Sequence, residues 1–413
     1  MSTPAQPRIG RMPGAFAVSP LRHRDYRVLS LATVFMGMAY IGESVVLGWL
    51  LLERTDSAFV VGLGIALRAA PNFLLGIPSG AIADRMDRRT LLRLMGFVMA
   101  LNSGVMAALA FGGVLSVGLI LVFTFTGGGL RALTQAARQS YAYDIAGPQQ
   151  AVGSLAMITL AQRVGGIVGS LAAGVIFDAG GAGAAYLALA LCMVAAGLVM
   201  FLARTPGEAA PAAHTPIWQG WREYAGEIGT NRTLATLVAL TAAVEVLGFS
   251  YMAALPSLAR DVLGLGAEGL GVLNAAGSVG AIVAILAISV RGEPARRGRL
   301  FLGVMIVFGL AVVVLGNSAA LAFGLIAIAV VSGLAALTDV LSQTLVQASV
   351  PNEFRGRAMG SWLLAIGFGP IGHIQMGLLV AVLGVSAAFS INGLLLVLLA
   401  LVAGLRATRI RRL

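Results

Sequence analysis

Long apolar stretches alternate with short polar ones along the whole chain. A helix needs about 20 apolar residues to cross a hydrocarbon core about 30 Å thick. The pattern predicts twelve such spans, at residues 28–52, 58–82, 90–112, 115–137, 150–177, 182–203, 233–257, 266–290, 299–316, 319–343, 356–383 and 386–406. The break between the ninth and tenth spans, Gly316-Asn317-Ser318, is the shortest, and Pro370 predicts a kink in the eleventh.

The longest internal polar segment divides these spans into two groups of six. It contains Trp218, Trp221 and Tyr224, residue types that favour the membrane interface, so we expect a short amphipathic helix there. The predicted organisation is an N-terminal tail, a first bundle, a linker, a second bundle and a C-terminal tail, at 1–27, 28–203, 204–232, 233–406 and 407–413.

The arginines predict the orientation in the membrane. Loops on the cytoplasmic side are rich in basic residues. With the N-terminus inside, 23 arginines fall on the inner side and only Arg54 and Arg260 fall outside. We therefore expect a multi-pass protein of a bacterial inner membrane with both termini in the cytoplasm.

Composition agrees with a protein that is surrounded by lipid. Hydrophobic residues make up 58% of the 413 residues and charged residues only 11%, against roughly 25% in soluble proteins. The net charge of +11 follows the topology of the loops, which favours lipid over nucleic acid as the partner. One cysteine, three scattered histidines and the absence of lysine and of a phosphate-binding Gly-Lys loop predict no metal site, no cofactor and no enzyme.

The two halves of the sequence resemble each other. Residues 129–134 (GLRALT) recur as 333–338 (GLAALT) at an offset of 204, and Glu43 has a counterpart in Glu245 at an offset of 202. Since each copy holds an even number of spans, both copies lie the same way up. The repeat predicts two six-helix bundles related by a pseudo-two-fold axis along the membrane normal.

The loop after the second span resembles the signature loop of the major facilitator superfamily. It reads GAIADRMDRR from Gly80 to Arg89, with Asp87 where many members have a second glycine. The resemblance covers span number, repeat and loop, and it implies an all-α transporter of twelve transmembrane helices.

In that family this loop acts as a conformational latch of the outward-facing state. Glycine permits close helix contact, and a carboxylate at a helix end can cap a neighbouring helix or pair with an arginine. The expected latch residues are Gly80, Asp84, Arg85, Arg88, Arg89, Arg138, Arg355 and Arg357.

Further segments resemble one branch of that family. Residues 21–27 (LRHRDYR), the Arg355-Gly-Arg357 segment and Gly369-Pro370 are similar to bacterial exporters of drugs and metabolites, among them macrolide efflux pumps and the enterobactin exporter. The lysophospholipid flippase of bacteria is a neighbouring branch.

Ionisable residues inside the spans are costly and are therefore candidates for function. Glu43 and Arg68 lie at similar depths in consecutive spans, which predicts an ion pair. Glu245 lies near the middle of the seventh span with no obvious partner. By family resemblance the first and seventh spans line the central cavity, so both glutamates are candidates for proton exchange or for recognition of substrate.

Other polar side chains in the spans have a structural interpretation beside the functional one. Asp339 lies near the inner end of its span, where it either faces water or lines the cavity. Arg163 and Arg131 either line the cavity or stabilise the bundle, and His373 is either a ligand group or a packed side chain. Small residues at Gly165, Gly169 and Ala173 predict a close helix contact, which the family resemblance places against the other half.

These features predict a secondary-active, proton-coupled exporter of a drug-like or siderophore-like molecule, working as a monomer by alternating access. The expected partners are a small organic or amphiphilic substrate, protons and membrane lipids. A flippase of lysophospholipid, a nutrient importer and a scaffold without transport are alternatives.

Overall fold

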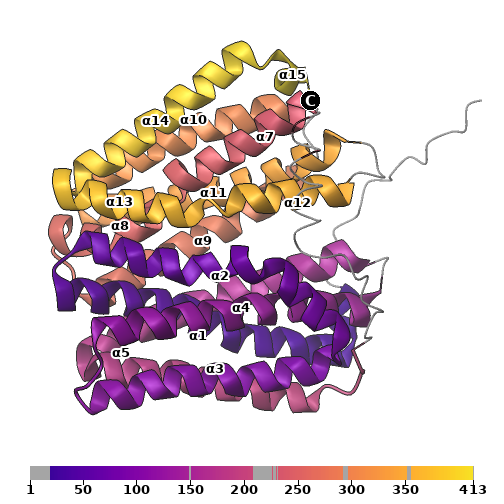
Figure 1. The fold of residues 1–413 in the computed structure, drawn as a ribbon, viewed down its shortest axis with the longest axis vertical. Helices are drawn as coiled ribbons and strands as arrows, with labels where there is room; N and C mark the ends of the chain where they lie inside the picture. The colour runs from indigo at the N-terminus through magenta and orange to yellow at the C-terminus, as the bar shows by residue number, and fades with distance from the viewer. Residues whose placement is uncertain are drawn as a thin grey trace, which may run out of the picture.

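The structure, a computed structural model, is built from helices (Figure 1). It describes residues 19–147, 150–207, 226, 229, 231–291, 296–350 and 355–412, without the side chains of 19–20, 75–85, 151–152, 289, 291, 355–357, 408 and 412. In this part of the chain, 10 helices are long and apolar enough to cross a membrane. The predicted all-α membrane fold is confirmed.

The first bundle contains five helices in the order of the chain. They are α1 (Arg24–Thr55), α2 (Ala58–Arg85), α3 (Arg88–Phe111), α4 (Val117–Ala146) and α5 (Ala151–Val199), with short 3-10 turns at Ser19–Arg22 and Met200–Leu202. At 49 residues α5 would be roughly 74 Å long, more than twice the membrane core. It is interrupted at Gly181, whose φ of 72° suits glycine, and therefore contains two of the predicted spans.

The second bundle follows the same plan with more interruptions. Its helices are α7 (Arg232–Ala243), α8 (Tyr251–Ser257), α9 (Ala267–Arg291), α10 (Arg297–Gly316), α11 (Leu321–Ala348), α12 (Arg355–Ile366), α13 (Gly369–Leu383), α14 (Val385–Arg406) and α15 (Thr408–Arg412). Two π-helical segments, η5 (Val244–Gly248) and η6 (Leu258–Val262), flank α8. The break after Gly316 and the interruption near Pro370 are confirmed, whereas the predicted amphipathic helix at Trp218 to Tyr224 lies outside the described residues.

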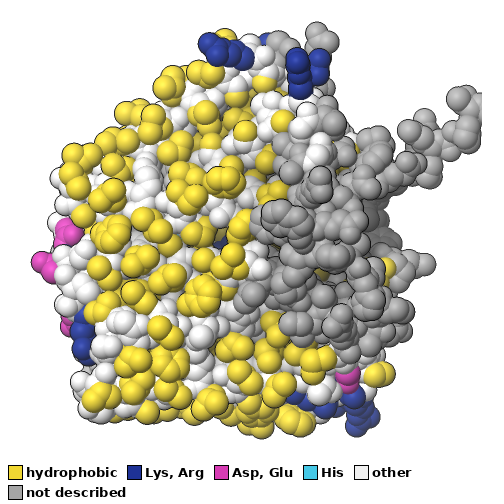
Figure 2. Space-filling model, in the orientation of Figure 1, with side chains coloured by type: hydrophobic (Ala, Val, Ile, Leu, Met, Phe, Trp, Pro, Cys, Tyr) yellow, Lys and Arg dark blue, Asp and Glu magenta, His cyan; other side chains and the backbone are white. Residues whose placement is uncertain are grey.

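The outer surface of the bundles is apolar. Figure 2 shows hydrophobic side chains spread over the visible face, with the charged ones near its edges. Large side chains such as Leu101 of α3 (67% exposed) and Phe323 of α11 (70% exposed) point outward. Such a surface is stable only against lipid.

The helix ends divide the molecule into two sides. The "terminus side" is where α1 begins and α14 ends, and the "opposite side" is where α1 ends and α2 begins. On the opposite side Ser57 and Ser116 cap α2 and α4 by accepting hydrogen bonds from Val60 N and Leu119 N.

The stripe of small residues in α5 packs against α1 of the same bundle. A Cβ added to Gly165 or Gly169 would overlap the backbone oxygen of Val34 or Met38. The expectation that this stripe contacts the other half is therefore wrong. The neighbouring stripe of α5 makes that contact, where Gly174 lies against Ala267 at the start of α9.

The two bundles meet through α5 with α9 and through α2 with α13. A Cβ on Gly174 would lie 2.5 Å from Ala267 O, and one on Gly377 would lie 2.7 Å from Ala58 O. Both contacts are near the opposite-side ends of the helices. The bundles are thus closed against each other on the opposite side.

We expect Gly165→Ala to lower the melting temperature of the protein in detergent. The added methyl meets rigid backbone, and such overpacking costs about 1–3 kcal/mol. Gly303→Ala is the matched control, because a Cβ there meets nothing within 4 Å in α10. Equal melting temperatures for the two variants would contradict the packing described here.

Candidate functional site

Glu43 and Arg68 form an ion pair inside the first bundle. Arg68 Nε donates to Glu43 Oε2 at 3.0 Å, and the guanidinium also donates to the backbone oxygen of Tyr40. Both side chains are largely buried, at 22% and 13% exposed. The pair predicted from equal depth is present, so Glu43 is a compensated carboxylate.

Arg131 of α4 lies beside this pair. It is one helical turn beyond Gly127, whose added Cβ would lie 3.9 Å from Glu43 Oε1. The charges of Arg68 and Glu43 both act on Arg131, yet its guanidinium makes no hydrogen bond or ion pair within the described part of the chain. Two arginines therefore share one glutamate.

Glu245 lies in the π-helical segment η5 of the second bundle. Its carboxylate is near Asp339 of α11, and both side chains line a small space together with Thr241, Thr338 and Ser342. Neither carboxylate takes part in an ion pair or hydrogen bond among the residues described. The structure thus brings together two candidates that the sequence had placed separately.

The π-helix at Glu245 had no recognisable signal in the sequence. It lies against α13, where a Cβ on Gly369 would be 3.2 Å from Glu245 Oε2 and one on Gly372 would be 2.6 Å from Val246 Cα. Small residues on α13 therefore make room for the wider turn. Such π turns occur often at functional sites.

Arg163 and His373 lie between the two bundles. Arg163 of α5 is close enough to Asp339 and Tyr251 of the second bundle to interact with them electrostatically. His373 of α13 is buried, its backbone oxygen packs against Gly62 of α2, and its Nδ1 lacks a hydrogen-bond partner in the described structure. His373 is therefore a buried side chain at the contact of α13 with α2.

Polar contacts close the opposite side. Asp178 of α5 accepts hydrogen bonds from the backbone N–H groups of Ala267 (3.2 Å) and Glu268 (2.8 Å), which begin α9. Arg260 of the second bundle pairs with Asp56 of the first at 2.7 Å. Sequence reasoning missed Asp178, because its partners are main-chain groups of a distant helix.

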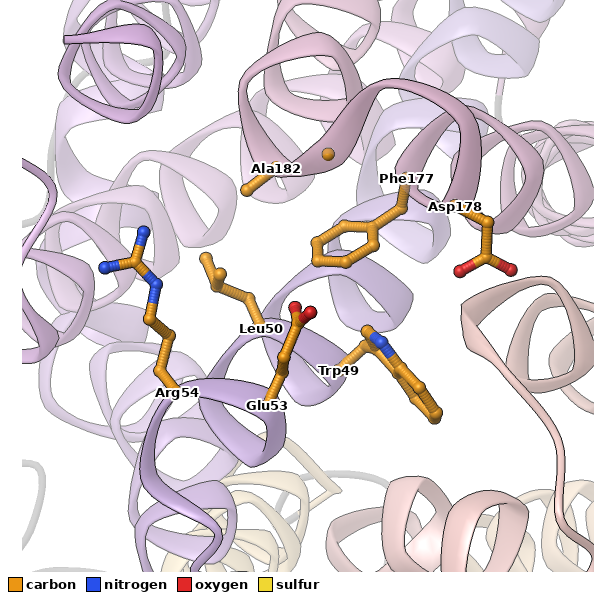
Figure 3. Close-up of a pocket in the computed structure, with 8 residues that line it drawn as sticks. Trp49, Leu50, Glu53, Arg54, Phe177, Asp178 and Ala182 are labelled. Carbon is orange, nitrogen blue, oxygen red and sulfur yellow. The ribbon is translucent and has the colours of Figure 1, made fainter. Parts of the chain in front are cut away.

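A cavity of about 480 Å³ at this end lies within the first bundle beside Asp178 (Figure 3). Figure 3 shows Glu53 and Phe177 pointing toward each other from α1 and α5. Its walls come from one bundle only, so it is distinct from the interface where Arg163 meets Asp339.

The described latch residues hold their own bundle together. Arg88 pairs with Asp144 of α4 at 2.6 Å, Arg89 donates to the backbone oxygen of Arg204 at 2.8 Å, and Arg138 donates to Gln162 at 2.5 Å. The remaining expected latch residues lie outside the described side chains: Gly80, Asp84, Arg85, Arg355 and Arg357.

Asp87, the departure from the family pattern, caps α3 and fixes the start of the linker. It accepts hydrogen bonds from Arg89 N (3.0 Å), Thr90 Oγ1 (2.9 Å) and Gly207 N (2.8 Å). Partial burial acts to raise the pKa of Asp87, but the hydrogen bonds from Gly207, Thr90 and Arg89 outweigh it and hold the pKa below its usual value of 3.8.

Two bundles of apolar helices, closed at one end and carrying buried charges between them, define a multi-pass membrane transporter. The family described as transmembrane secretion effector matches residues 15–411. The chain belongs to this family of the major facilitator superfamily.

Comparisons with individual proteins agree. The chain is 27% identical to the enterobactin exporter EntS of Citrobacter koseri, over 87% of this chain and 86% of that one. It is 23% identical to the staphyloferrin A transporter of Staphylococcus aureus, over 87% and 90%. Its fold is similar to those of a POT peptide transporter in complex with sulfate (TM-score 0.76, 13% identity, 94% and 95% covered) and the nucleoside transporter NupG (0.75, 13%, 92% and 98%).

We expect Asp87→Ala to lower the free energy of unfolding by roughly 1 kcal/mol at pH 7, since an N-cap is lost. Asp87→Asn keeps a hydrogen-bond acceptor, so its free energy of unfolding should fall by less. Folding lowers the pKa of Asp87, so its charged form stabilises the folded state, and this stabilisation is fully present above about pH 4. It disappears as the pH falls through the pKa that Asp87 has in the folded protein. Thermal unfolding of Asp87→Asn and wild type at pH 7 and pH 3 measures this, and a difference that grows on acidification would contradict it.

We expect Asp178→Ala to open the opposite side. Losing charge-assisted hydrogen bonds of about 1.5–3 kcal/mol shifts the ratio of open to closed molecules about tenfold or more. Spin labels at Phe111 and Phe323, exposed ends of α3 and α11 on that side, report the separation in a Cys192→Ala background. Glu53→Ala is the control, and an unchanged distance distribution in Asp178→Ala would refute the role of this contact.

Proposed function

We propose that this protein is a proton-coupled exporter of siderophore-like organic molecules that works by alternating access. The names of its relatives support the substrate class, since they are an enterobactin exporter and a staphyloferrin A transporter. The closeness of Glu245 and Asp339 inside the second bundle supports coupling to protons.

Two carboxylates in a small intramembrane cavity are suited to carry a proton. An uncompensated carboxylate in an apolar environment is costly, and two of them repel each other, so proton uptake relieves both costs. The space between the side chains around this pair is too small for a water molecule, so it excludes a drug-sized one. Glu43 lacks this property because Arg68 neutralises it.

The contacts between the bundles support alternating access. The described polar contacts between bundles, Asp178 with α9 and Asp56 with Arg260, lie on the opposite side. We propose that the terminus side is cytoplasmic, as the arginine distribution indicates, so that this closed end faces away from the cell interior. The protein would then load substrate from the cytoplasm in the inner membrane, as a monomer among lipids.

Inverted vesicles with an imposed pH gradient test this function, with enterobactin and staphyloferrin A as probes. We expect the rate of gradient-driven uptake to fall at least tenfold in Glu245→Gln and in Asp339→Asn, because the proton carrier is removed. Exchange of labelled for unlabelled substrate without a gradient should persist, since it needs no net proton movement. Glu53→Gln, at an exposed carboxylate on the opposite side, should behave as wild type.

Gradient-driven uptake at wild-type rates in both variants would remove Glu245 and Asp339 from the coupling mechanism. Absence of uptake in wild type, together with movement of labelled lysophospholipid between leaflets, would replace the exporter with the flippase alternative.

A further inference from the structure

Two arginines without a hydrogen bond or ion pair in the described chain lie in the middle of the spans of the first bundle. Arg131 is about 15 residues from either end of α4, and Arg163 is 12 residues from the start of α5 and 15 before Asp178. At 1.5 Å per residue, both are roughly 20 Å from the helix ends. They are therefore deep in the membrane, where an isolated cation is costly.

Neither guanidinium has a protein partner in the described chain. Arg131 and Arg163 make no hydrogen bond and no ion pair there, and both side chains are partly exposed. The one carboxylate beside Arg131 is Glu43, which already binds Arg68 at 3.0 Å. A guanidinium has five N–H donors, so these two groups leave several donors available for hydrogen bonds to a ligand.

Arg163 faces the second bundle. Ser170 and Gly174 contact α9, and Arg163 is seven and eleven residues before them, on the same stripe of α5. Its electrostatic interaction with Asp339 and Tyr251 agrees with this direction. Its exposed part therefore opens toward the bundle interface and not toward lipid.

The two arginines lie at similar depths in the membrane. Arg138 and Gln162 are hydrogen-bonded and mark the same level on α4 and α5, which run in opposite directions. Arg131 is seven residues before Arg138, and Arg163 follows Gln162. Their separation along the helix axes is therefore roughly 9 Å, so different groups of one extended organic molecule at this depth would face the two arginines.

We propose that the transporter binds its substrate as an anion, with carboxylate or phenolate groups accepting hydrogen bonds from Arg131 and Arg163. This inference rests on the proposed export function and names the charge class of its substrate. Arginine is suited to such groups because its planar donors match a carboxylate in two-bond geometry. Organic cations are disfavoured on this wall of the first bundle, where Arg68 and Arg131 share Glu43 and Arg163 lies nearest to Asp339 of the second bundle.

Glu245 and Asp339 do not reverse this preference. The space that they line is far too small for a drug-sized ligand. Arginines lie in the first bundle and the pair of carboxylates lies in the second, and this arrangement separates substrate binding from proton binding. The first bundle holds the anionic substrate, and the second holds the proton.

Titration calorimetry on the purified full-length protein in detergent tests the inference, with citrate, 2,3-dihydroxybenzoate and the cation ethidium as probes. We expect Arg131→Gln and Arg163→Gln to weaken binding of the anions at least tenfold without weakening that of ethidium. Arg299→Gln, at an exposed arginine of α10, is the matched control and should bind as wild type. Raising the salt concentration should weaken binding of the anions to the wild-type protein.

Wild type that binds neither anion, or glutamine variants that bind them as tightly as wild type, would overturn the inference. If a glutamine variant fails to fold, the lysine variant at that position carries the test, since it keeps the charge and loses the two-bond geometry. Unchanged affinity there also overturns it. Vesicles separate the two proposals: export of ethidium but of no anion refutes the anion class alone, whereas arginine-dependent binding without any gradient-driven transport refutes export alone.

Discussion

The structure depends on the cost of placing a charge in hydrocarbon, since each ionised side chain in a span needs a partner, water or a proton. Glu43 and Glu245 occupy equivalent places in the two halves of the sequence repeat, yet they meet this cost differently. Glu43 is bound by Arg68, whereas Glu245 lies beside a second carboxylate, Asp339. Both halves of the repeat therefore have a carboxylate at this position, but the neighbouring helix supplies an arginine in one half and a second carboxylate in the other.

The two ends of the molecule are held by different kinds of contact. On the opposite side the bundles bind each other, with Asp178 on the first N–H groups of α9 and with glycine contacts between α5 and α9. On the terminus side, the described contacts of Arg88, Arg89 and Asp87 stay within the first bundle and the start of its linker. Within the described residues, contacts inside the first bundle and at the start of the linker thus hold the terminus side, whereas contacts between bundles hold the opposite side, which suits motion of the bundles as bodies.

The sequence predicted those features that depend on local pattern. Span positions follow from apolar length alone, and the Glu43–Arg68 pair followed from equal depth in consecutive helices. Features set by packing between distant segments were not predictable. The partner of the Gly165–Gly169 stripe was assigned to the wrong helix, because spacing shows that a contact is close and not which helix makes it. Asp178 escaped notice because main-chain N–H groups carry no sequence signal.

The π turn at Glu245 links the carboxylate pair to the interrupted span formed by α12 and α13. A π turn is less stable than the α-helix it interrupts, so its presence requires compensation by packing. That compensation comes from Gly369 and Gly372 at the start of α13, directly after the interruption that separates α12 from α13. A change in the charge of Glu245 therefore acts on the point where this span is already broken. Arg163 reaches the same region from the other bundle, so the electrostatic balance there also depends on how the two bundles are placed.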